Sequence, residues 1–455
     1  MPRLPIVLVH GYSDMGASFR TWCDLLKARG YDATTIHIGN YVSLSNEVTI
    51  KDIAEGFDRA LRERAGLKPD EPFDAIVHST GMLVVREWLA AYASRAERLK
   101  HLIGLAPATF GSPMAHKGRS WLGAIFKGGK EPGPDFMEAG DRVLAGLELG
   151  SRYTWDLAHK DFLNDTAVYG PSSRTPYPFI IIGLKDYGWL KRVVTEPGTD
   201  GTVRWAGAGF NVRKVIADLT VDPTSPGFGR RMQIQPWRNL TVPLIFSPNV
   251  NHGTILQAPT DDVVSMVVEA LETSSKPTYD SWCLKWEKKS KDVLKTTKAR
   301  RWQQFVTHAV DERGDGIRDY FLQVGTIKNG TFSSLPFDLD VHAYRDDPSY
   351  RCFHVDLDRI GTDNLERLAL RVIAESGTEL VSYQGYSSSP SFTPRKRDEG
   401  KWDAVIEFDA TIGSKEVEFF WPYTTTLVEI RMDREPMPLK EPNNVFWFGS
   451  KDGGK

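Results

Sequence analysis

The sequence predicts an α/β fold over about the first 275 residues and a β-rich region after residue 302. In the first part, short apolar runs alternate with amphipathic, helix-like segments, which is the pattern of parallel strands joined by crossover helices. In the second part, apolar residues recur with a period of two between turns rich in Gly, Asp, Asn and Ser, which is typical of a β-sandwich. The length of 455 residues also favours more than one domain.

The first elements follow one another in βαβ order. The hydrophobic pattern predicts a strand over 5–9, a helix over 18–30, a strand over 31–38, a helix over 49–65 and a strand over 74–79. The first of these strands ends in His10-Gly11-Tyr12, and the last ends in Ser79.

The run Val77-His78-Ser79-Thr80-Gly81 has the features of a nucleophile elbow. In such an elbow, a serine occupies a sharp turn from a strand to a helix and exposes its hydroxyl at the carboxyl end of the strand. The small Gly81 allows the helix to pack close to the strand. A serine alone is a weak nucleophile, so catalysis also requires a base, an acid that orients the base, and oxyanion donors.

Later strands end in residues that meet these requirements. A strand is expected over 178–184, and the Gly-flanked turn that follows carries Asp200. The next strand, over 242–247, precedes Asn251-His252-Gly253 and a closing helix over 260–273. Asp200 could also be a carboxylate that only hydrogen-bonds its own turn. Its competitors Asp186, Asp218 and Asp222 lack the Gly-flanked turn, and the other nine histidines lack the context of His252.

These motifs resemble the lipase and carboxylesterase branch of the α/β-hydrolase superfamily over residues 4–274. The run Phe110-Gly111-Ser112-Pro113-Met114-Ala115 is similar to a turn common in lipases, and the order serine, acid, histidine is that of the superfamily. Val77 departs from the Gly-x-Ser-x-Gly pattern, although it still belongs to the strand. The resemblance implies a triad of Ser79, Asp200 and His252, oxyanion donors on the backbone of Tyr12 and Thr80, and supporting roles for His10, Gly11, His78 and Gly81.

A long stretch separates the expected strand over 102–107 from the strand over 178–184. An α/β core does not need an insertion of this length, so we expect a cap or lid over about 112–165. It is either a mobile lid that lines an acyl pocket or a static cap packed on the core.

A boundary is expected near residue 275. The sequence predicts a catalytic domain over 1–275, a basic linker helix over 276–301 and a β-sandwich over 302–455. The basic segment is either a face for a membrane or an anionic substrate, or a solvated connecting helix, which we favour. Within the β-sandwich, residues 361–374 are expected to form one helix or a long crossover, and the aromatic residues are expected to form core rather than a ligand platform.

Composition excludes several classes of function. The net charge of −2 provides no general attraction to nucleic acid or to a membrane, and no apolar run approaches the roughly 20 residues of a membrane span. No signal peptide is visible, so a cytoplasmic location is expected, although a trimmed secreted chain would look the same. Cys23, Cys283 and Cys352 suggest neither a disulfide framework nor a zinc site. No metal or cofactor is expected, and the oligomeric state stays open.

The expected function is hydrolysis of carboxylic esters, with a small-molecule or lipid ester as substrate and transient contact with a lipid interface. A phospholipase or an acyltransferase would use the same triad, because the acyl group can pass to water or to an alcohol. The alternative from another class is a lipid- or partner-binding protein on a disabled hydrolase scaffold.

Overall fold

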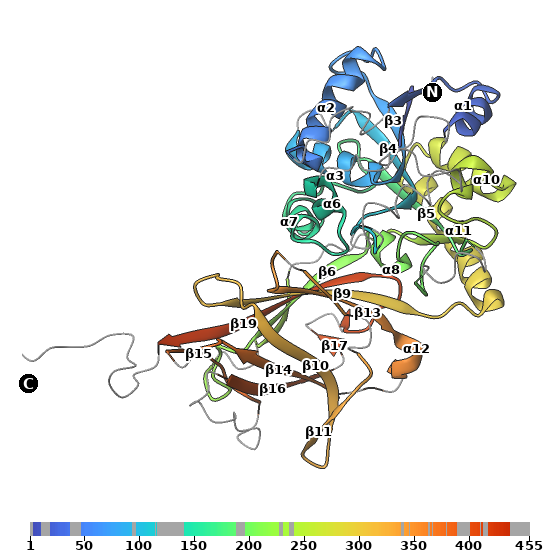
Figure 1. Ribbon diagram of the computed structural model, residues 1–455. Helices are drawn as coiled ribbons and strands as arrows, with labels where there is room; N and C mark the ends of the chain where they lie inside the picture. The colour runs from blue at the N-terminus through green and yellow to red at the C-terminus, as the bar shows by residue number, and fades with distance from the viewer. Residues whose placement is uncertain are drawn as a thin grey trace, which may run out of the picture. The chain divides into compact units, whose positions relative to one another are not determined.

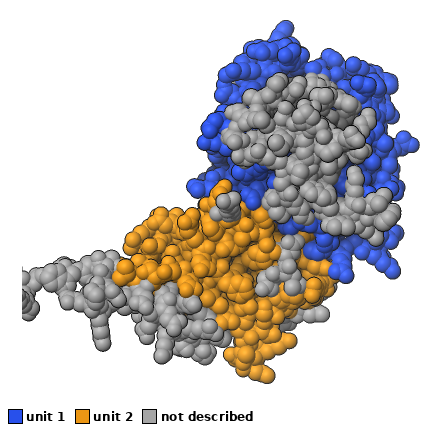
Figure 2. All heavy atoms as spheres, viewed as in Figure 1, with its two compact units in different colours: residues 1–212, 238–302, 422–425 blue, residues 213–237, 303–421, 426–455 orange. Residues whose placement is uncertain are grey.

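The computed structural model describes two compact units. The described residues are 3–10, 19–36, 47–92, 97–113, 115, 141–187, 196–226, 231–235, 241–337, 341–344, 346–362, 365, 367–378, 380–388, 401–409, 411–412 and 417–436. Unit 1 comprises residues 1–212, 238–302 and 422–425, and unit 2 comprises residues 213–237, 303–421 and 426–455 (Figure 2).

A six-stranded parallel sheet forms the centre of unit 1 (Figure 1). Its order is β2-β1-β3-β4-β5-β8, and every neighbouring pair is parallel. The strands are β1 (Ile6–Val9), β2 (Ala33–Ile36), β3 (Phe73–Ser79), β4 (Leu99–Pro107), β5 (Tyr177–Gly183) and β8 (Leu244–Ser247). Because all six strands point the same way, their carboxyl ends meet at one edge of the sheet. The predicted α/β fold is confirmed.

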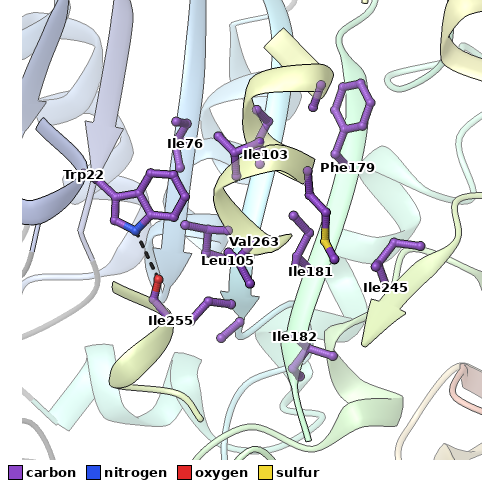
Figure 3. Packing of buried hydrophobic residues seen from close by; sticks show 14 of the residues in the cluster. Trp22, Ile76, Ile103, Leu105, Phe179, Ile181, Ile182, Ile245, Ile255 and Val263 are labelled. Carbon is purple, nitrogen blue, oxygen red and sulfur yellow. Dashed lines mark hydrogen bonds between the residues drawn. The ribbon is translucent and has the colours of Figure 1, made fainter. Parts of the chain in front are cut away.

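Helices cover both faces of this sheet. They are α1 (Arg20–Lys27), α2 (Ile50–Glu63), α3 (Gly81–Ala91), α6 (Asp141–Leu147), α7 (Arg152–Asp161), α8 (Trp205–Ala208), α9 (Thr254–Gln257), α10 (Asp261–Leu271) and α11 (Lys276–Thr297). Strand residues alternate between the two faces, so that Ile6 joins the core cluster under α1, α10 and α11 and Val7 joins the cluster under α2 and α3. Figure 3 shows part of the first cluster, where the Trp22 indole N–H donates to the Ile255 carbonyl at 3.1 Å.

Helix α11 covers the edge of the sheet. It starts at a capping box made by Ser275 and Thr278 and buries Tyr279, Trp282 and Trp286 along one face. The Ser290 hydroxyl accepts a hydrogen bond from the Phe246 N–H of the edge strand β8, at 3.0 Å. The expectation of a solvated connecting helix is therefore wrong for the inner face of α11, because its aromatic residues recur at the spacing of one helical face.

Unit 2 contains two large β-sheets that share a core, and β17 and β18 pair in a separate two-stranded sheet. One is antiparallel, in the order β11-β10-β14-β16, and the other has the order β12-β13-β9-β19-β6-β7 with β15 paired to β19. The bounds are β6 (Val212–Asp218), β7 (Met232–Ile234), β9 (Trp302–Asp311), β10 (Asp319–Lys328), β11 (Thr331–Ser334), β12 (Val341–Ala343), β13 (Tyr350–Asp356), α12 (Leu357–Ile360), β14 (Arg367–Glu375), β15 (Val381–Gln384), β16 (Lys401–Asp409), β17 (Thr411–Ile412), β18 (Val417–Glu418) and β19 (Thr425–Pro436). Phe305 and Val428 of one sheet and Leu322 and Val372 of the other lie in a single apolar cluster. This is the predicted sandwich-like architecture.

The helix or crossover expected over 361–374 is wrong. Strand β14 occupies most of this stretch and pairs with β10 on one side and β16 on the other. Its buried residues Leu368, Leu370, Val372 and Ala374 recur with a period of two, which a strand requires and a helix does not satisfy.

The two units interleave along the chain, unlike the predicted domains. Residues 213–237 belong to unit 2 because β6 lies beside β19 and pairs with β7. Residues 422–425 belong to unit 1, where the Thr425 hydroxyl donates to the Ala206 carbonyl at 2.9 Å. Helix α11 also belongs to unit 1 rather than to a separate linker. Among the described residues, no helix has the length and apolar character to cross a bilayer.

Candidate active site

Ser79 occupies a strained turn at the end of β3. Its φ is +53°, in the left-handed region that residues with a side chain rarely adopt, and Thr80 then leads into α3 with φ −59°. The Ser79 carbonyl accepts from the Ala108 N–H at 3.0 Å, so the end of β3 is held by the chain that follows β4. Strain of this kind persists where the surroundings fix it, and it is typical of functional sites.

The close packing behind Ser79 depends on Gly81. A Cβ atom at this position would lie 2.5 Å from the Val9 carbonyl oxygen, at the end of β1. A glycine is therefore needed where α3 starts beside β1. Val77, the residue that departs from the family pattern, is buried and stays in the ladder between Val9 and Gly104. The departure leaves the turn itself intact.

Asp200 and His252 form a buried pair. The Nδ1 atom of His252 lies 2.9 Å from Oδ2 of Asp200, and both side chains are fully shielded from solvent. The other carboxylate oxygen, Oδ1, accepts from the backbone N–H groups of Thr202 and Val203 at 3.0 and 2.8 Å. Asp200 therefore bonds both its own turn and the His252 ring, one with each oxygen, so it is not a carboxylate that bonds its own turn alone. Its role as the acid of a triad stays a prediction. With Nδ1–H donating to Asp200, the ring presents Nε2 as its proton acceptor.

The backbone brings the two loops together. The His252 N–H donates to the Asp200 carbonyl at 3.0 Å. At the end of β5, a Cβ atom on Gly183 would lie 2.2 Å from the Val250 carbonyl oxygen, so the histidine loop crosses this strand end at close range. The Ser112 hydroxyl donates to the Thr202 carbonyl at 2.6 Å and joins the lipase-like turn to the acid loop.

Three histidine rings lie side by side at this edge of the sheet. The His78 ring lies 4.5 Å from that of His252 and 5.4 Å from that of His10, measured between centroids. The Nε2–H of His78 donates to the His252 carbonyl at 2.9 Å, so the residue before Ser79 holds the residue proposed as base. Desolvation, and next the neighbouring His252 and His10, lower the pKa of His78 well below its usual value. His78 is therefore neutral and serves as a fixed donor.

The predicted site residues are brought together where they are described. Ser79, Thr80, His78 and His10 end or follow β1 and β3, and the Asp200–His252 pair meets the His78 ring. Gly11 and Tyr12, the expected source of the second oxyanion donor, lie outside the described residues.

A buried ion pair between α3 and α7 was not predicted from the sequence. Arg86 of α3 donates from Nε and Nη2 to the two carboxylate oxygens of Asp161, at 2.7 and 3.0 Å, and also bonds the Thr109 carbonyl. The Tyr169 hydroxyl donates to the same carboxylate at 2.8 Å. The ion pair joins α3, α7 and the turn after β4. The available signal is a lone arginine at a buried position of an apolar helix.

The described part of the cap packs on the core. Val143 and Leu147 of α6 and Leu157 of α7 lie in the same apolar cluster as α2 and α3. The glycine-broken stretch 120–126 of the expected cap or lid lies outside the described residues, so the choice between a mobile lid and a static cap stays open there. Within the described part of the chain, no group of three or more His, Cys, Asp or Glu side chains could hold a metal ion.

Comparison with solved structures identifies the fold. No protein-family model and no curated protein matches the sequence. Phospholipase PlaB from Legionella pneumophila is similar over 98% of this chain and 97% of its own, with a TM-score of 0.76 and 23% sequence identity. PlaB in complex with thio-NAD gives a TM-score of 0.76 at 22% identity over the same shares. A lipase of Bacillus licheniformis, BlEst2, covers 58% of this chain and 91% of its own at 15% identity and a TM-score of 0.36. The chain has the α/β-hydrolase fold with an added β-rich part.

Proposed function

We propose that this α/β-hydrolase chain is a carboxylic ester hydrolase that acts on lipid or other acyl esters through a triad of Ser79, His252 and Asp200. The observation that carries the proposal is the buried Asp200–His252 pair, whose ring lies against His78 directly before the strained Ser79. A nucleophile, a base and an orienting acid are the three groups that acyl transfer by a serine requires.

The reaction follows from these groups. Nε2 of His252 accepts the hydroxyl proton of Ser79 as Oγ attacks the ester carbonyl, and Asp200 holds the ring in the required tautomer and stabilises the imidazolium. The backbone N–H groups of Thr80 and Tyr12 receive the developing oxyanion, and loss of one such donor typically costs about a hundredfold in rate. The imidazolium then protonates the leaving alcohol. Water, deprotonated by His252, releases the acid from the acyl-enzyme.

A phospholipase is the second candidate. The likeness to PlaB, a phospholipase, spans both units of this chain and favours it over an esterase that has only a catalytic unit. Release of a lyso-phospholipid and a fatty acid from vesicles would distinguish it from an esterase, and transfer of the acyl group to an added alcohol would indicate an acyltransferase.

The test is a panel of nitrophenyl esters of increasing chain length, measured with and without detergent. Hydrolysis by the parent and its loss in Ser79→Ala, with an unchanged circular dichroism spectrum, is the expected result. A serine-directed phosphonate should label the parent and leave Ser79→Ala unlabelled, whereas Ser274→Ala, on an exposed serine, should behave as the parent. Full activity in Ser79→Ala would exclude the triad. Lack of both labelling and hydrolysis in the parent would favour a binding protein on a disabled scaffold.

A further inference from the structure

The outer face of α11 carries an exposed row of lysines. Leu284, Lys288, Lys291 and Lys295 follow one another at spacings of four and three residues, which places them on one side of the helix, and Lys298 is the residue that caps its end. All five are exposed, and Leu284 is 70% accessible to solvent. We call these five residues the lysine stripe.

The stripe differs in charge from the rest of the chain. Residues 276–301 hold nine Lys or Arg and three Asp or Glu, whereas the whole chain has a net charge of −2. The neighbouring row on the same helix is neutralised, since Lys285 and Lys289 pair with Glu269 and Asp262 of α10 at 2.7 and 2.6 Å.

The lysines of the stripe have few acidic partners. Lys288, Lys295 and Lys298 have no ion pair with any residue that the structure describes, and Lys291 pairs with Glu287 of the same helix at 2.8 Å. Such an array of cations on a nearly neutral protein calls for an anionic partner.

The direction of α11 places the stripe beside the active-site edge. Near its start, the Tyr279 hydroxyl donates to the Pro178 carbonyl, at the beginning of β5. Further along, Ser290 bonds Phe246 near the end of β8. Beyond the helix, the Trp302 ring lies 2.7 Å from where a Cβ atom on Gly198 would stand, in the loop that carries Asp200. The helix therefore runs with the strands, and Lys295 and Lys298 lie toward the carboxyl edge of the sheet.

We propose that the lysine stripe docks this protein on the surface of an anionic phospholipid bilayer. From Lys288 to Lys298 the stripe spans about 15 Å at the helical rise per residue, so it matches an extended array of phosphates rather than one small anion. Leu284 adds an apolar side chain that can enter the acyl boundary, and lysine stems can lie along that boundary with their ammonium groups in water. The proposal rests on the proposed function in one respect: docking would bring Ser79 to lipid esters.

The test measures sedimentation of the full chain with vesicles. One set contains phosphatidylcholine alone, and the other contains phosphatidylcholine with an equal part of phosphatidylserine. The test variant is Lys288→Gln/Lys291→Gln/Lys295→Gln, which keeps good helix formers. The control, Lys51→Gln/Arg64→Gln/Lys68→Gln, removes three exposed cations at α2 and its end. Each basic residue near an anionic surface contributes about fivefold in partition, so the test variant should lose roughly a hundredfold.

The control should bind as the parent does, and added salt should weaken binding, because the Debye length falls from about 10 Å at 0.1 M to about 3 Å at 1 M. Equal binding by the parent and the test variant, or no preference for the anionic vesicles, would overturn the proposal. Lysine-dependent binding to duplex DNA that is tighter than binding to vesicles would also overturn it. Ser79→Ala should bind vesicles fully, and the test variant should hydrolyse a soluble short-chain ester at the parent rate. Vesicle binding thus tests the docking surface, and hydrolysis of the soluble ester tests the proposed chemistry, so failure of one can be told from failure of the other.

Discussion

At Gly81, the space available for a single carbon atom determines whether the elbow forms. Gly81→Ala would place a methyl group 2.5 Å from the Val9 carbonyl oxygen, so α3 must move away from β1. We expect a loss of about 1–3 kcal/mol in the free energy of unfolding, as for other overpacked sites, together with loss of ester hydrolysis. Urea denaturation and the nitrophenyl ester assay measure the two effects.

Gly56→Ala is the matched control. Gly56 is an exposed position of α2 where an added Cβ meets nothing within 4 Å, so this change should stabilise the chain by up to about 1 kcal/mol. If Gly81→Ala were as stable and active as Gly56→Ala, the inference that α3 packs too close to β1 for a Cβ atom at residue 81 would be wrong.

Burial of His78 should make the free energy of unfolding depend on pH. Burial holds its pKa in the folded chain well below the usual histidine value of 6.5, so below this pH the unfolded chain takes up a proton that the folded chain does not. The stability that comes from a neutral His78 is therefore present above pH 6.5 and is lost as the pH falls, by up to about 1.4 kcal/mol per pH unit.

In His78→Asn, the amide can still donate to the His252 carbonyl but does not titrate. Its free energy of unfolding should fall less steeply than that of the parent between about pH 7 and 5, as measured by urea denaturation. Equal slopes in the parent and His78→Asn would show that burial does not hold His78 neutral.

The residues that sequence alone could find are those whose chemistry shows in local patterns. Ser79, Asp200 and His252 each follow an apolar strand and stand beside small residues, so strand ends could be searched for them. The ion pair of Arg86 could not be predicted in this way, because its partner Asp161 is 75 residues away and neither residue belongs to a motif. The arrangement of the His10, His78 and His252 rings likewise depends on how parallel strands converge, which no local pattern encodes.

At the scale of elements, the Arg86–Asp161 pair holds two helices in place. Both side chains are fully shielded from solvent, so removal of one partner leaves a buried charge. Arg86→Met should cost about 3–5 kcal/mol in the free energy of unfolding and should lower ester hydrolysis, because α3 starts at the elbow.

The double variant Arg86→Met/Asp161→Leu separates the charge from the packing. With no unpaired charge left, it should recover part of the lost stability in a double-mutant cycle measured by urea denaturation. A double variant that loses the sum of both single losses would contradict the coupling between α3 and α7.

Some features of helix α11 were predictable from the sequence, and others were not. The sequence predicted a helix with a basic character, and both features are present. The aromatic row at Tyr279, Trp282 and Trp286 is equally visible in the sequence, yet which sheet edge it covers is decided by β8, and the order of strands in a sheet is a tertiary property.

At the scale of the whole molecule, the interleaving of the units predicts the outcome of truncation. A chain that ends at residue 302 keeps β6 but loses β19, the strand beside it, and loses Pro422–Thr425 from unit 1. In that segment, the Tyr423 N–H donates to the Trp302 carbonyl at 2.6 Å and the Tyr423 ring packs on Phe246 at 4.9 Å.

We therefore expect the chain 1–302 to aggregate or to lack a cooperative unfolding transition in thermal denaturation. A chain that ends at residue 436 retains every described element and is the control. A soluble, active 1–302 chain would show that unit 1 does not need its distant segment. The division into α/β and β-rich regions was predictable from periodicity, but the pairing of β6 with β19 joins residues about two hundred positions apart and leaves no mark in either strand.

The segment Pro422–Thr425 also determines how late in synthesis unit 1 can finish folding. Unit 1 contains Ser79 near the start of the chain but is complete only after Thr425 has left the ribosome. At roughly 5–20 residues per second, the interval between these two residues lasts roughly 20–70 s. We expect the nascent chain to remain inactive toward esters throughout this interval, because unit 1 cannot take up residues 422–425 before they have been synthesised.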